Sequence, residues 1–271
     1  MQIAIVQTDI APLYQTPHIH TTRIDEVLYG MAVTVLAVVG DMAKIRTSYR
    51  YEGYTPTACL CTQEAAVTRW QRAQKAWVQK PYLDVLAQPR VQGEILHSVP
   101  RGALLQMQEA ELCEGWQTVT LLNGTRGYVQ QNALTPTAAA EKLPEDVLRK
   151  AVCESALSYL GTQYRWGGKT PLGIDCSGLT SMAYLVNGVA LYRDAAIKTG
   201  FPLHEIPFAN VKPADLWFFS GHVALSLGGG RFVHATAYPA TNGVCIASLC
   251  SEDSGYRADL KASLYAAGSI F

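Results

Sequence analysis

The apolar and polar residues of this chain follow one pattern up to about residue 138 and a different pattern after it. In the front part, short apolar runs such as residues 32–39, 104–107 and 116–121 are separated by glycine-containing turns. Short apolar runs bounded by turn residues are typical of β-strands. We therefore predict that the front part is built from small β-modules.

The β-modules come as two diverged copies. Gly30 and Gly102 each precede a hydrophobic strand, and Gly53 and Gly127 each precede a tyrosine, at an offset of 72 to 74 residues. Self-similarity at a constant offset indicates two units of the same fold. Between the copies, residues 63–80 are rich in Ala, Gln, Arg and Lys, which predicts a helical connector.

After residue 140 the pattern changes to helices followed by strands. Pro144 is expected to open a helix, and a second apolar stripe at helical spacing begins after Asp175. The buried face of the first helix is expected to comprise Leu148, Ala151, Val152, Ala156 and Tyr159. Residues 222–227 and 231–235 then form two strands around a glycine turn. Helices first and an antiparallel sheet later indicate an α+β domain.

These patterns predict four segments. The first β-module covers residues 1–62 and the helical connector covers residues 63–80. The second β-module covers residues 81–138, with a linker at 135–140, and the C-terminal α+β domain covers residues 139–271.

Composition and charge exclude several classes of protein. Of the 271 residues, 49% are apolar and 16% are charged, so a sizeable core is expected and disorder is not. The net charge of zero argues against nucleic-acid binding, which needs a basic face. The longest apolar run, residues 31–39, is too short to cross a bilayer, so no membrane partner is expected.

The chain begins without a basic and apolar leader pattern, and it carries seven cysteines. An odd count fits free thiols in a reducing compartment, so we expect a cytoplasmic protein, with secretion by another route as the alternative. Cys59 and Cys61 have no matching second pair, and no metal site is predicted.

The sequence Asp175-Cys176-Ser177-Gly178 places one thiol at an expected helix start. Asp175 is suited to cap the helix, which leaves Cys176 in the first turn. A helix N-terminus favours a thiolate, and the thiolate is the form that attacks carbonyl carbons. The alternative is a buried cysteine without a catalytic role.

Cysteine catalysis also needs a base close to the sulfur and a group that orients the base. With Gly228-Gly229-Gly230 as a three-residue loop, His234 pairs with Ala224, which shares a strand face with His222. Both imidazoles are therefore expected on one face. Alternatives are two satisfied strand histidines, or a zinc site of Cys176, His222 and His234.

Four motifs in this order resemble the NlpC/p60 cell-wall cysteine peptidases, which have a papain-like fold. The motifs are Tyr-Arg-Trp-Gly-Gly at 164–168, Asp-Cys-Ser-Gly at 175–178, Gly-His-Val-Ala at 221–224 and Phe-Val-His-Ala at 232–235. The match covers roughly residues 140 to 250. The front modules resemble bacterial SH3-like barrels, as found in the subgroup of γ-D-glutamyl-L-diamino acid endopeptidases.

The resemblance implies a role for each motif residue. Cys176 would be the nucleophile, His222 the general base and acid, and His234 the residue that orients His222. The hydroxyl of Tyr164, together with a backbone N–H at the helix start, would stabilise the oxyanion.

The resemblance also implies how substrate is held. Asp175 and Ser177 would bind the free amine of the substrate's N-terminal L-alanine, whereas Asp175 as a helix cap only is the alternative. The first β-module would supply an aromatic residue, for which Tyr54 is the candidate. It would also supply an acid, for which Asp25, Glu26 and Glu52 are candidates.

One position departs from the family pattern. The family's Pro-Gly-Asp-Leu is Pro213-Ala214-Asp215-Leu216 here, which changes a turn and no catalytic atom.

From the resemblance we expect a cysteine endopeptidase that hydrolyses the γ-D-glutamyl–diamino acid bond of murein peptides, with diaminopimelate or lysine as the diamino acid. The protein is expected to be monomeric and to need no metal or organic cofactor. Two alternatives are an acyltransferase or amidase on the same scaffold, and a non-catalytic protein whose SH3-like pair binds the cell wall.

Overall fold

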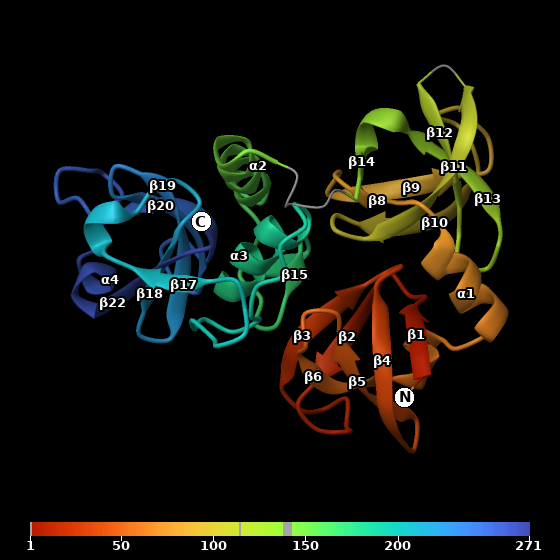
Figure 1. Cartoon of the computed structure of the whole chain (residues 1–271), viewed down its shortest axis with the longest axis horizontal. Helices are drawn as coiled ribbons and strands as arrows, with labels where there is room; N and C mark the ends of the chain where they lie inside the picture. Colours follow the sequence, from red (N-terminus) through yellow and green to blue (C-terminus); the bar gives the residue numbers. More distant parts are fainter. Residues whose placement is uncertain (1, 114, 138–142) are drawn as a thin grey trace. The chain divides into compact units, whose positions relative to one another are not determined.

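The computed structural model describes residues 2–113, 115–137 and 143–271, and it divides into two compact units (Figure 1). Unit 1 covers residues 1–137 and unit 2 covers residues 138–271. Residues 138–140 of the predicted linker at 135–140 lie outside the described residues.

Unit 1 contains the predicted repeat. Its described residues form two seven-stranded antiparallel sheets, in the orders β3-β2-β6-β5-β4-β1-β7 and β10-β9-β13-β12-β11-β8-β14. Each strand of the second sheet therefore takes the place of the strand seven elements earlier. The strands of the first sheet are β1 (Gln2–Val6), β2 (Ile10–Tyr14), β3 (Arg23–Leu28), β4 (Ala32–Val39), β5 (Met42–Thr47), β6 (Glu52–Pro56) and β7 (Leu60–Cys61). Those of the second are β8 (Lys75–Val78), β9 (Tyr82–Leu86), β10 (Ile95–Pro100), β11 (Leu104–Cys113), β12 (Trp116–Thr120), β13 (Arg126–Gln130) and β14 (Leu134–Pro136).

The connector is shorter than its composition suggested. Helix α1 covers Glu64–Arg72, and Lys75–Val78 is strand β8, which pairs with β11 and β14. The helical connector over 63–80 and the start of the second module at 81 are therefore corrected. Ala76 and Val78 are fully buried, so the gain from completing the second core outweighs the helix propensity of this stretch.

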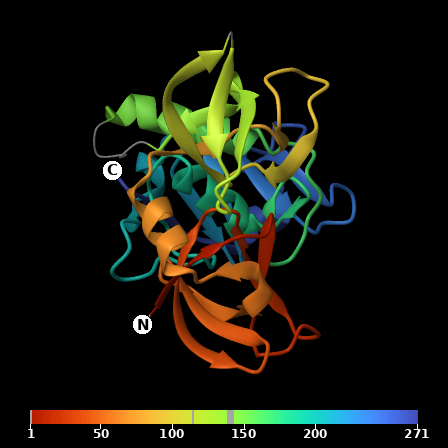
Figure 2. The same cartoon turned by 90° about the vertical axis from the view of Figure 1, so that its right-hand side faces the viewer.

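Within unit 1, the two modules meet at Tyr29. The Tyr29 carbonyl accepts a hydrogen bond from the Leu104 amide at 2.9 Å, and its hydroxyl accepts one from the Leu122 amide at 2.7 Å. The indole of Trp70, on α1, packs edge-on against Tyr29 and donates to the Gly30 carbonyl at 2.9 Å. Figure 2 shows α1 beside the junction of the two β-rich halves.

Unit 2 confirms the α+β prediction. Helix α2 (Glu145–Leu157) and helix α3 (Cys176–Leu185) precede a six-stranded antiparallel sheet of order β17-β22-β18-β19-β20-β21 in the described residues. The strands of this sheet are β17 (His204–Ile206), β18 (Leu216–Phe219), β19 (His222–Gly228), β20 (Arg231–Thr236), β21 (Gly243–Ser248) and β22 (Leu264–Ser269). Figure 1 shows α2 and α3 on one side of the sheet and α4 (Ala258–Ser263) on the other.

Each face of this sheet is covered by a helix. Helix α3 packs on β19 and β20, and α2 packs on α3. On the opposite face, Leu260 of α4 belongs to a buried cluster with Trp217, Phe219, Ala224 and Phe232. A two-stranded ribbon of β15 (Lys169–Thr170) and β16 (Gly173–Ile174) leads into α3.

The turn between β19 and β20 differs from the three-residue loop that the sequence predicted. Gly228 pairs with Arg231, so the loop itself is Gly229-Gly230, and a β-bulge lies between Ser226 and Gly228. The bulge adds one residue to β19 and restores the face parity that a plain two-residue loop would have reversed. Leu225 pairs with Val233, which is the register that the three-residue loop implied.

In the turn before β18, Ala214 adopts the left-handed backbone conformation that favours glycine. Ala214 is buried and has a φ of 75°. Its amide donates to the Ser226 carbonyl at 2.8 Å, and its carbonyl accepts from the Tyr184 hydroxyl at 2.6 Å. Left-handed backbone is costly for a residue with a Cβ, so these contacts hold Ala214 in a strained conformation.

Replacing Ala214 with glycine is expected to stabilise unit 2 by about 1 kcal/mol, because glycine adopts this φ without a Cβ clash. The free energy of unfolding in urea measures the effect. Ala183→Gly, inside α3, is the matched control and is expected to destabilise by about 1 kcal/mol or more. A destabilising Ala214→Gly would contradict the strain.

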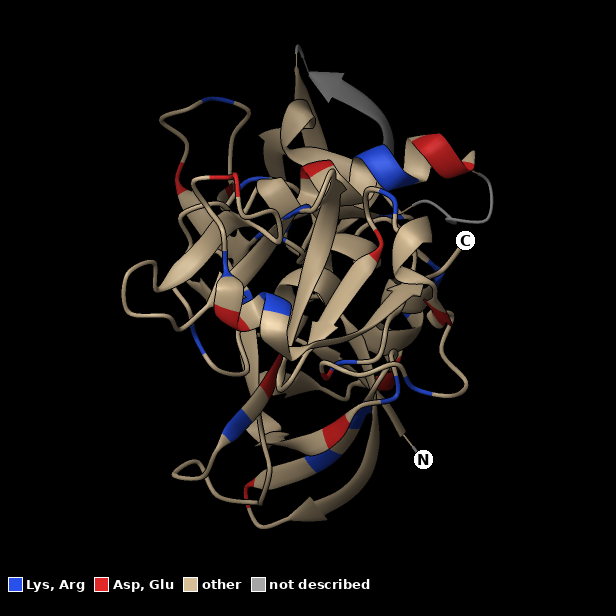
Figure 3. Ribbon diagram, turned by 90° about the vertical axis from the view of Figure 1, so that its left-hand side faces the viewer, with Lys and Arg blue, Asp and Glu red and all other residues tan. Residues whose placement is uncertain are grey.

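No described helix is long and apolar enough to span a membrane. Figure 3 shows Lys, Arg, Asp and Glu residues of both signs dispersed over the ribbon, in keeping with the balanced charge of the chain.

Candidate active site

Cys176 is the first residue of α3, as predicted. The preceding residue, Asp175, has extended backbone, and its Oδ1 accepts the Gly178 amide at 2.6 Å. This is an N-cap contact, which satisfies one of the free amides of the first helical turn. Cys176 is 7% exposed, so its thiol lies at the edge of the core.

The glycine-rich motif at 164–168 packs against the start of α3. The Gly167 amide donates to Asp175 Oδ2 at 2.7 Å, and the Asp175 amide donates to the Gly168 carbonyl at 3.3 Å. A Cβ on Gly178 would overlap the Gly168 carbonyl oxygen, and a Cβ on Gly168 would overlap the Gly173 carbonyl oxygen. The two motifs therefore carry glycine because their backbones approach too closely for any side chain.

Two backbone amides point at the thiol sulfur. Burial raises the pKa of the Cys176 thiol to about 11, and the Asp175 carboxylate adds to the rise. The N–H groups of Val223 and Ser177 act in the opposite direction by hydrogen bonding to the sulfur, as does the positive charge of Arg193. The thiol is therefore protonated at neutral pH in the free protein, and it must lose its proton during attack.

His222 and His234 lie side by side, as the register argument predicted. His222 Nε2 is 2.8 Å from His234 Nδ1, and the two rings meet edge to face with centroids 5.0 Å apart. Because the Val223 amide reaches the Cys176 sulfur, the start of β19 lies against the thiol. His222 opens that strand.

The contact between the two rings restricts their tautomers. If His222 donates from Nε2 to His234 Nδ1, then His222 Nδ1 carries a lone pair and can accept a proton. In that arrangement His234 carries its own proton on Nε2, an atom that is buried without a hydrogen-bond partner in the described structure. Only this tautomer allows His222 to act as a base.

Both imidazoles are neutral at physiological pH. Burial lowers the pKa of His222 to about 4, and nearby Arg257 adds to the effect. Burial, followed by the neighbouring His222, lowers the pKa of His234 to about 3. A neutral imidazole can accept a proton from a neutral thiol.

These depressed pKa values predict that unit 2 loses stability in acid. In the unfolded chain both histidines bind protons below about pH 6.5, whereas the folded protein resists protonation until about pH 4. The free energy of unfolding should therefore fall by about 4 kcal/mol between about pH 7 and about pH 5, about 2 kcal/mol for each histidine. Urea unfolding at the two pH values measures this, and His234→Gln should make the dependence shallower. An unchanged slope in His234→Gln would contradict the assignment.

Tyr164 lies within electrostatic reach of Cys176 and Asp175. Burial is the main cause that raises the pKa of its hydroxyl, and the charges of Cys176 and Asp175 add to it. Its backbone bridges to Ile174, two residues before the thiol. A protonated phenol here can donate a hydrogen bond to a developing oxyanion.

The carboxylate of Asp175 is occupied by protein groups, which does not favour the predicted contact with a substrate amine. Arg193 forms a two-point ion pair with it, at 3.0 Å to Oδ1 and 2.9 Å to Oδ2. Arg193 also donates to Ser177 Oγ at 2.7 Å, and Ser177 Oγ donates to Asp175 at 3.3 Å. With the amides of Gly167 and Gly178, these contacts fill both carboxylate oxygens, so the helix-cap alternative fits better.

Arg193 was not predicted from the sequence. It follows Leu191 and Tyr192 in a segment without helical or strand periodicity, and it is only 1% exposed. A buried arginine in a loop leaves no trace in a hydrophobic pattern, so only the fold could reveal its partner.

The predicted residues of the first β-module lie in unit 1. Tyr54 is on β6, opposite Tyr14 and Lys44. Of the candidate acids, Asp25 accepts a hydrogen bond from the Tyr49 hydroxyl at 2.6 Å, and Glu26 pairs with Arg23 at 3.1 Å. Glu52 pairs with Arg46 and Lys44, at 2.6 and 3.1 Å. Their roles toward substrate stay predictions.

In the described part of the chain, no three His, Cys, Asp or Glu side chains come together as a set of metal ligands.

Comparisons with known proteins agree with this geometry. The model of the NlpC/P60 family matches residues 161–255, a range that contains Cys176, His222 and His234. A protein of Lysinibacillus sphaericus named dipeptidyl-peptidase 6 is 41% identical over 99% of both chains. The γ-D-glutamyl-L-lysine dipeptidyl-peptidase of Bacillus subtilis is 27% identical over 78% of this chain and 71% of its own.

The fold has a counterpart among solved structures. An NlpC/P60 family protein from Bacillus cereus superposes with a TM-score of 0.81, covers 98% of both chains and is 20% identical. The likeness extends over both units, so the predicted architecture of a β-rich front part and a C-terminal α+β domain of this fold is confirmed.

Proposed function

The chain belongs to the NlpC/P60 family, and from this premise we propose that it is a cysteine endopeptidase of murein peptides. In this proposal it cleaves the bond between γ-D-glutamate and the following diamino acid. The main observation behind this proposal is that the thiol of Cys176, at the capped start of α3, lies against strand β19. That strand begins with His222, whose ring contacts His234. The substrate class is supported by the names of the two peptidases described above, of which the first is similar over 99% of this chain.

The first half of the reaction is acylation. As Cys176 Sγ attacks the γ-carbonyl carbon of D-glutamate, its proton passes to His222 Nδ1. The resulting imidazolium is held by the hydrogen bond from His222 Nε2 to His234 Nδ1. The Tyr164 hydroxyl donates to the tetrahedral oxyanion. Collapse of this intermediate breaks the C–N bond, and the leaving amine takes the proton from His222.

The second half is hydrolysis of the thioester. His222, neutral again, removes a proton from a water molecule as the water attacks the acyl carbon. The thiolate leaves and recovers its proton from His222, so the enzyme returns to its starting state. The products are an acyl peptide that ends in γ-D-glutamate and a free diamino acid or a peptide that begins with one.

We expect the enzyme to release a dipeptide, L-alanyl-γ-D-glutamate, from peptides with a free N-terminus. The support for this is the word dipeptidyl-peptidase in the names of both relatives. Both oxygens of Asp175 accept hydrogen bonds from Arg193, and the contact of Asp175 and Ser177 with the substrate amine stays a prediction.

A panel of murein peptides tests the proposal. L-Ala-γ-D-Glu-diaminopimelate and its lysine analogue, each with a free and an acetylated N-terminus, are incubated with the protein, and the products are identified by mass spectrometry. Release of L-Ala-γ-D-Glu from the free peptides supports the proposal. An α-linked D-glutamyl isomer is the control and should remain intact. Cleavage at any other bond, or none of the γ-linked peptides cleaved, would refute it.

A further inference from the structure

Arg193 is the one described arginine that forms an ion pair with Asp175, the residue directly before the thiol. Its guanidinium spans Asp175 Oδ1, Asp175 Oδ2 and Ser177 Oγ, so it contacts the side chains on both sides of Cys176. Arg193 and Asp175 are 1% and 6% exposed. A charge-assisted, two-point contact with so little water around it is geometrically strict.

This contact acts on the helix that carries the thiol. Asp175 caps α3 through the Gly178 amide and holds the Gly167 amide with its other oxygen. Arg193 binds both oxygens, so it fixes the plane of the carboxylate and with it the first turn of α3. The Ser177 amide, one of the two that point at the sulfur, belongs to this turn.

The contact also balances charge beside the thiol. A buried carboxylate next to a sulfur opposes thiolate formation, because like charges repel strongly where water is excluded. Asp175 and Arg193 act on Cys176 in opposite directions. Without Arg193, the helix cap would leave an uncompensated negative charge against the nucleophile.

We propose that Arg193 is a positioning residue of the active site, which lets an ionised Asp175 cap the nucleophile helix without suppressing the Cys176 thiolate. This role rests on the proposed function, in which Cys176 is the nucleophile. In this role the positive charge of Arg193 compensates the negative charge of Asp175 beside the thiol, which the sequence alone did not reveal.

The elements packed against α3 carry further titratable groups. His222 on β19 and His234 on β20 are neutral near pH 7, and Tyr164 carries its proton. On β15, Lys169 is buried. On α2, Arg149 bonds to Glu145 and Asp215. Of the charged residues, Asp175 and Arg193 are those that act directly on the sulfur.

The test uses the alkylation of Cys176 by iodoacetamide, which needs no substrate and follows the thiolate fraction. Rates are measured from about pH 7 to about pH 10, with mass spectrometry of the peptide that contains Cys176, since other cysteines are also free. This range lies below the thiol pKa of about 11, so the rate rises about tenfold per pH unit and a shift of the midpoint displaces the whole profile along the pH axis by the same amount. Arg193→Met is expected to shift the midpoint by about one pH unit to higher pH, and Asp175→Asn by about one unit to lower pH. The double variant should return close to the original midpoint.

Opposite shifts distinguish charge compensation from a merely structural role, since loss of structure would move both single variants in the same direction. Midpoints that stay unchanged in both single variants, or that move together, would overturn the proposal. If Arg193→Met does not fold, the alkylation profiles of Asp175→Asn and Arg193→Lys test the proposal instead. Lysine keeps the positive charge but cannot make the two-point contact of a guanidinium, so the alkylation midpoint of Arg193→Lys should stay near the original. The midpoint of Asp175→Asn should still shift to lower pH.

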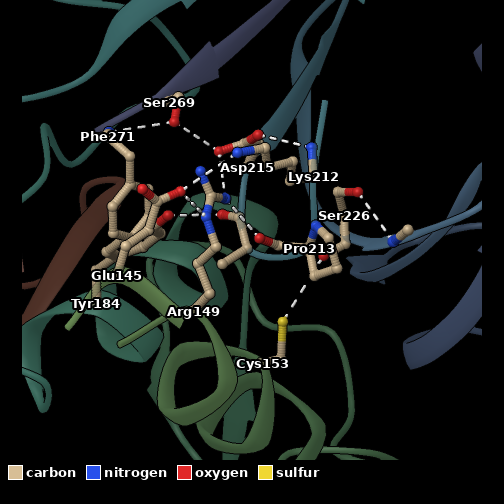
Figure 4. A network of polar contacts seen from close by, with 12 residues as sticks. Glu145, Arg149, Cys153, Tyr184, Lys212, Pro213, Asp215, Ser226, Ser269 and Phe271 are labelled. Carbon is tan, nitrogen blue, oxygen red and sulfur yellow. Dashed lines mark hydrogen bonds and ion pairs between the residues drawn. The ribbon is translucent and has the colours of Figure 1, made fainter. Parts of the chain in front are cut away.

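A second buried arginine of unit 2 provides the matched control. Arg149 donates to Asp215 Oδ1 at 2.8 Å and to the Pro213 carbonyl at 2.7 Å, and Ser269 donates to the same carboxylate at 2.6 Å (Figure 4). Arg149→Met should lower the stability of unit 2 without moving the alkylation midpoint of Cys176. A shift as large as that of Arg193→Met would overturn the proposal.

The proposal and the proposed function can fail separately. Failure of the unaltered protein to cleave any γ-linked murein peptide would refute the function while leaving the alkylation profiles intact. Normal peptide cleavage with unshifted profiles would refute the role of Arg193 alone.

Discussion

Cys176→Ser is expected to lower the rate of hydrolysis of a γ-D-glutamyl peptide by at least about 10⁴-fold. A serine hydroxyl is nearly the same size as a thiol, so α3 and its cap should be undisturbed. A serine hydroxyl is a far weaker nucleophile, however. It is also a weaker acid than a thiol, so the neutral imidazole of His222 removes its proton less readily. Single-turnover kinetics on L-Ala-γ-D-Glu-lysine measure the loss.

A second cysteine of the same unit serves as control for this substitution. Cys153 lies half-buried on α2, with its thiol 3.8 Å from the Ser226 carbonyl. Cys153→Ser should retain the rate within about twofold, because no step uses this thiol. Loss of activity in Cys153→Ser, or retained activity in Cys176→Ser, would remove Cys176 from the mechanism.

His222→Gln is expected to lower kcat by about 10³-fold or more, because the thiol would lose its proton acceptor. His234→Gln should cost less, about 10²-fold, since glutamine can still accept the hydrogen bond of His222 through its amide oxygen. Steady-state kinetics of the two variants on the same peptide measure these effects.

The two histidines act as a unit, so their effects should not add. The double variant is expected to lose little more than His222→Gln alone, because His234 works through His222. Additive losses would mean that His234 has a separate role and that its 2.8 Å contact with His222 is incidental.

The internal repeat of the front part was visible in the sequence because its glycines and tyrosines recur at a nearly constant offset. Identical strand orders in the two sheets bear this out. The first strand of the second copy was missed because Lys75–Val78 follows a helix-rich composition and is too short to show an alternating pattern. Its identity as a strand comes from its neighbours β11 and β14, which lie far away in sequence.

The geometry of the candidate site was predictable where local rules fix it. A cap residue before an apolar stripe located Cys176, and strand parity placed His222 and His234 together. The bulge between Ser226 and Gly228 was not predicted, although it compensated the shorter loop. A three-residue loop and a two-residue loop with a bulge place the strand residues on the same faces. The alternation of apolar and polar residues therefore could not distinguish the two turns.

The sequence was least informative about Asp175. Next to a reactive thiol its carboxylate suggested an ammonium ligand, but the fold brings Arg193 from 18 residues away to neutralise it. Such pairing depends on the path of a loop without periodicity, which a single sequence does not encode in a readable pattern. Asp175 therefore gains a role in supporting the nucleophile helix, and its contact with a substrate amine stays a prediction.

Trapping of the acyl-enzyme tests directly whether Cys176 is the nucleophile. The protein is mixed with L-Ala-γ-D-Glu 4-nitroanilide, whose good leaving group favours accumulation of the thioester, quenched in acid and digested for mass spectrometry. One L-Ala-γ-D-Glu acyl group is expected on the peptide that contains Cys176. Release of nitroaniline with the acyl group on another residue, or with no acylated peptide at any time, would contradict it.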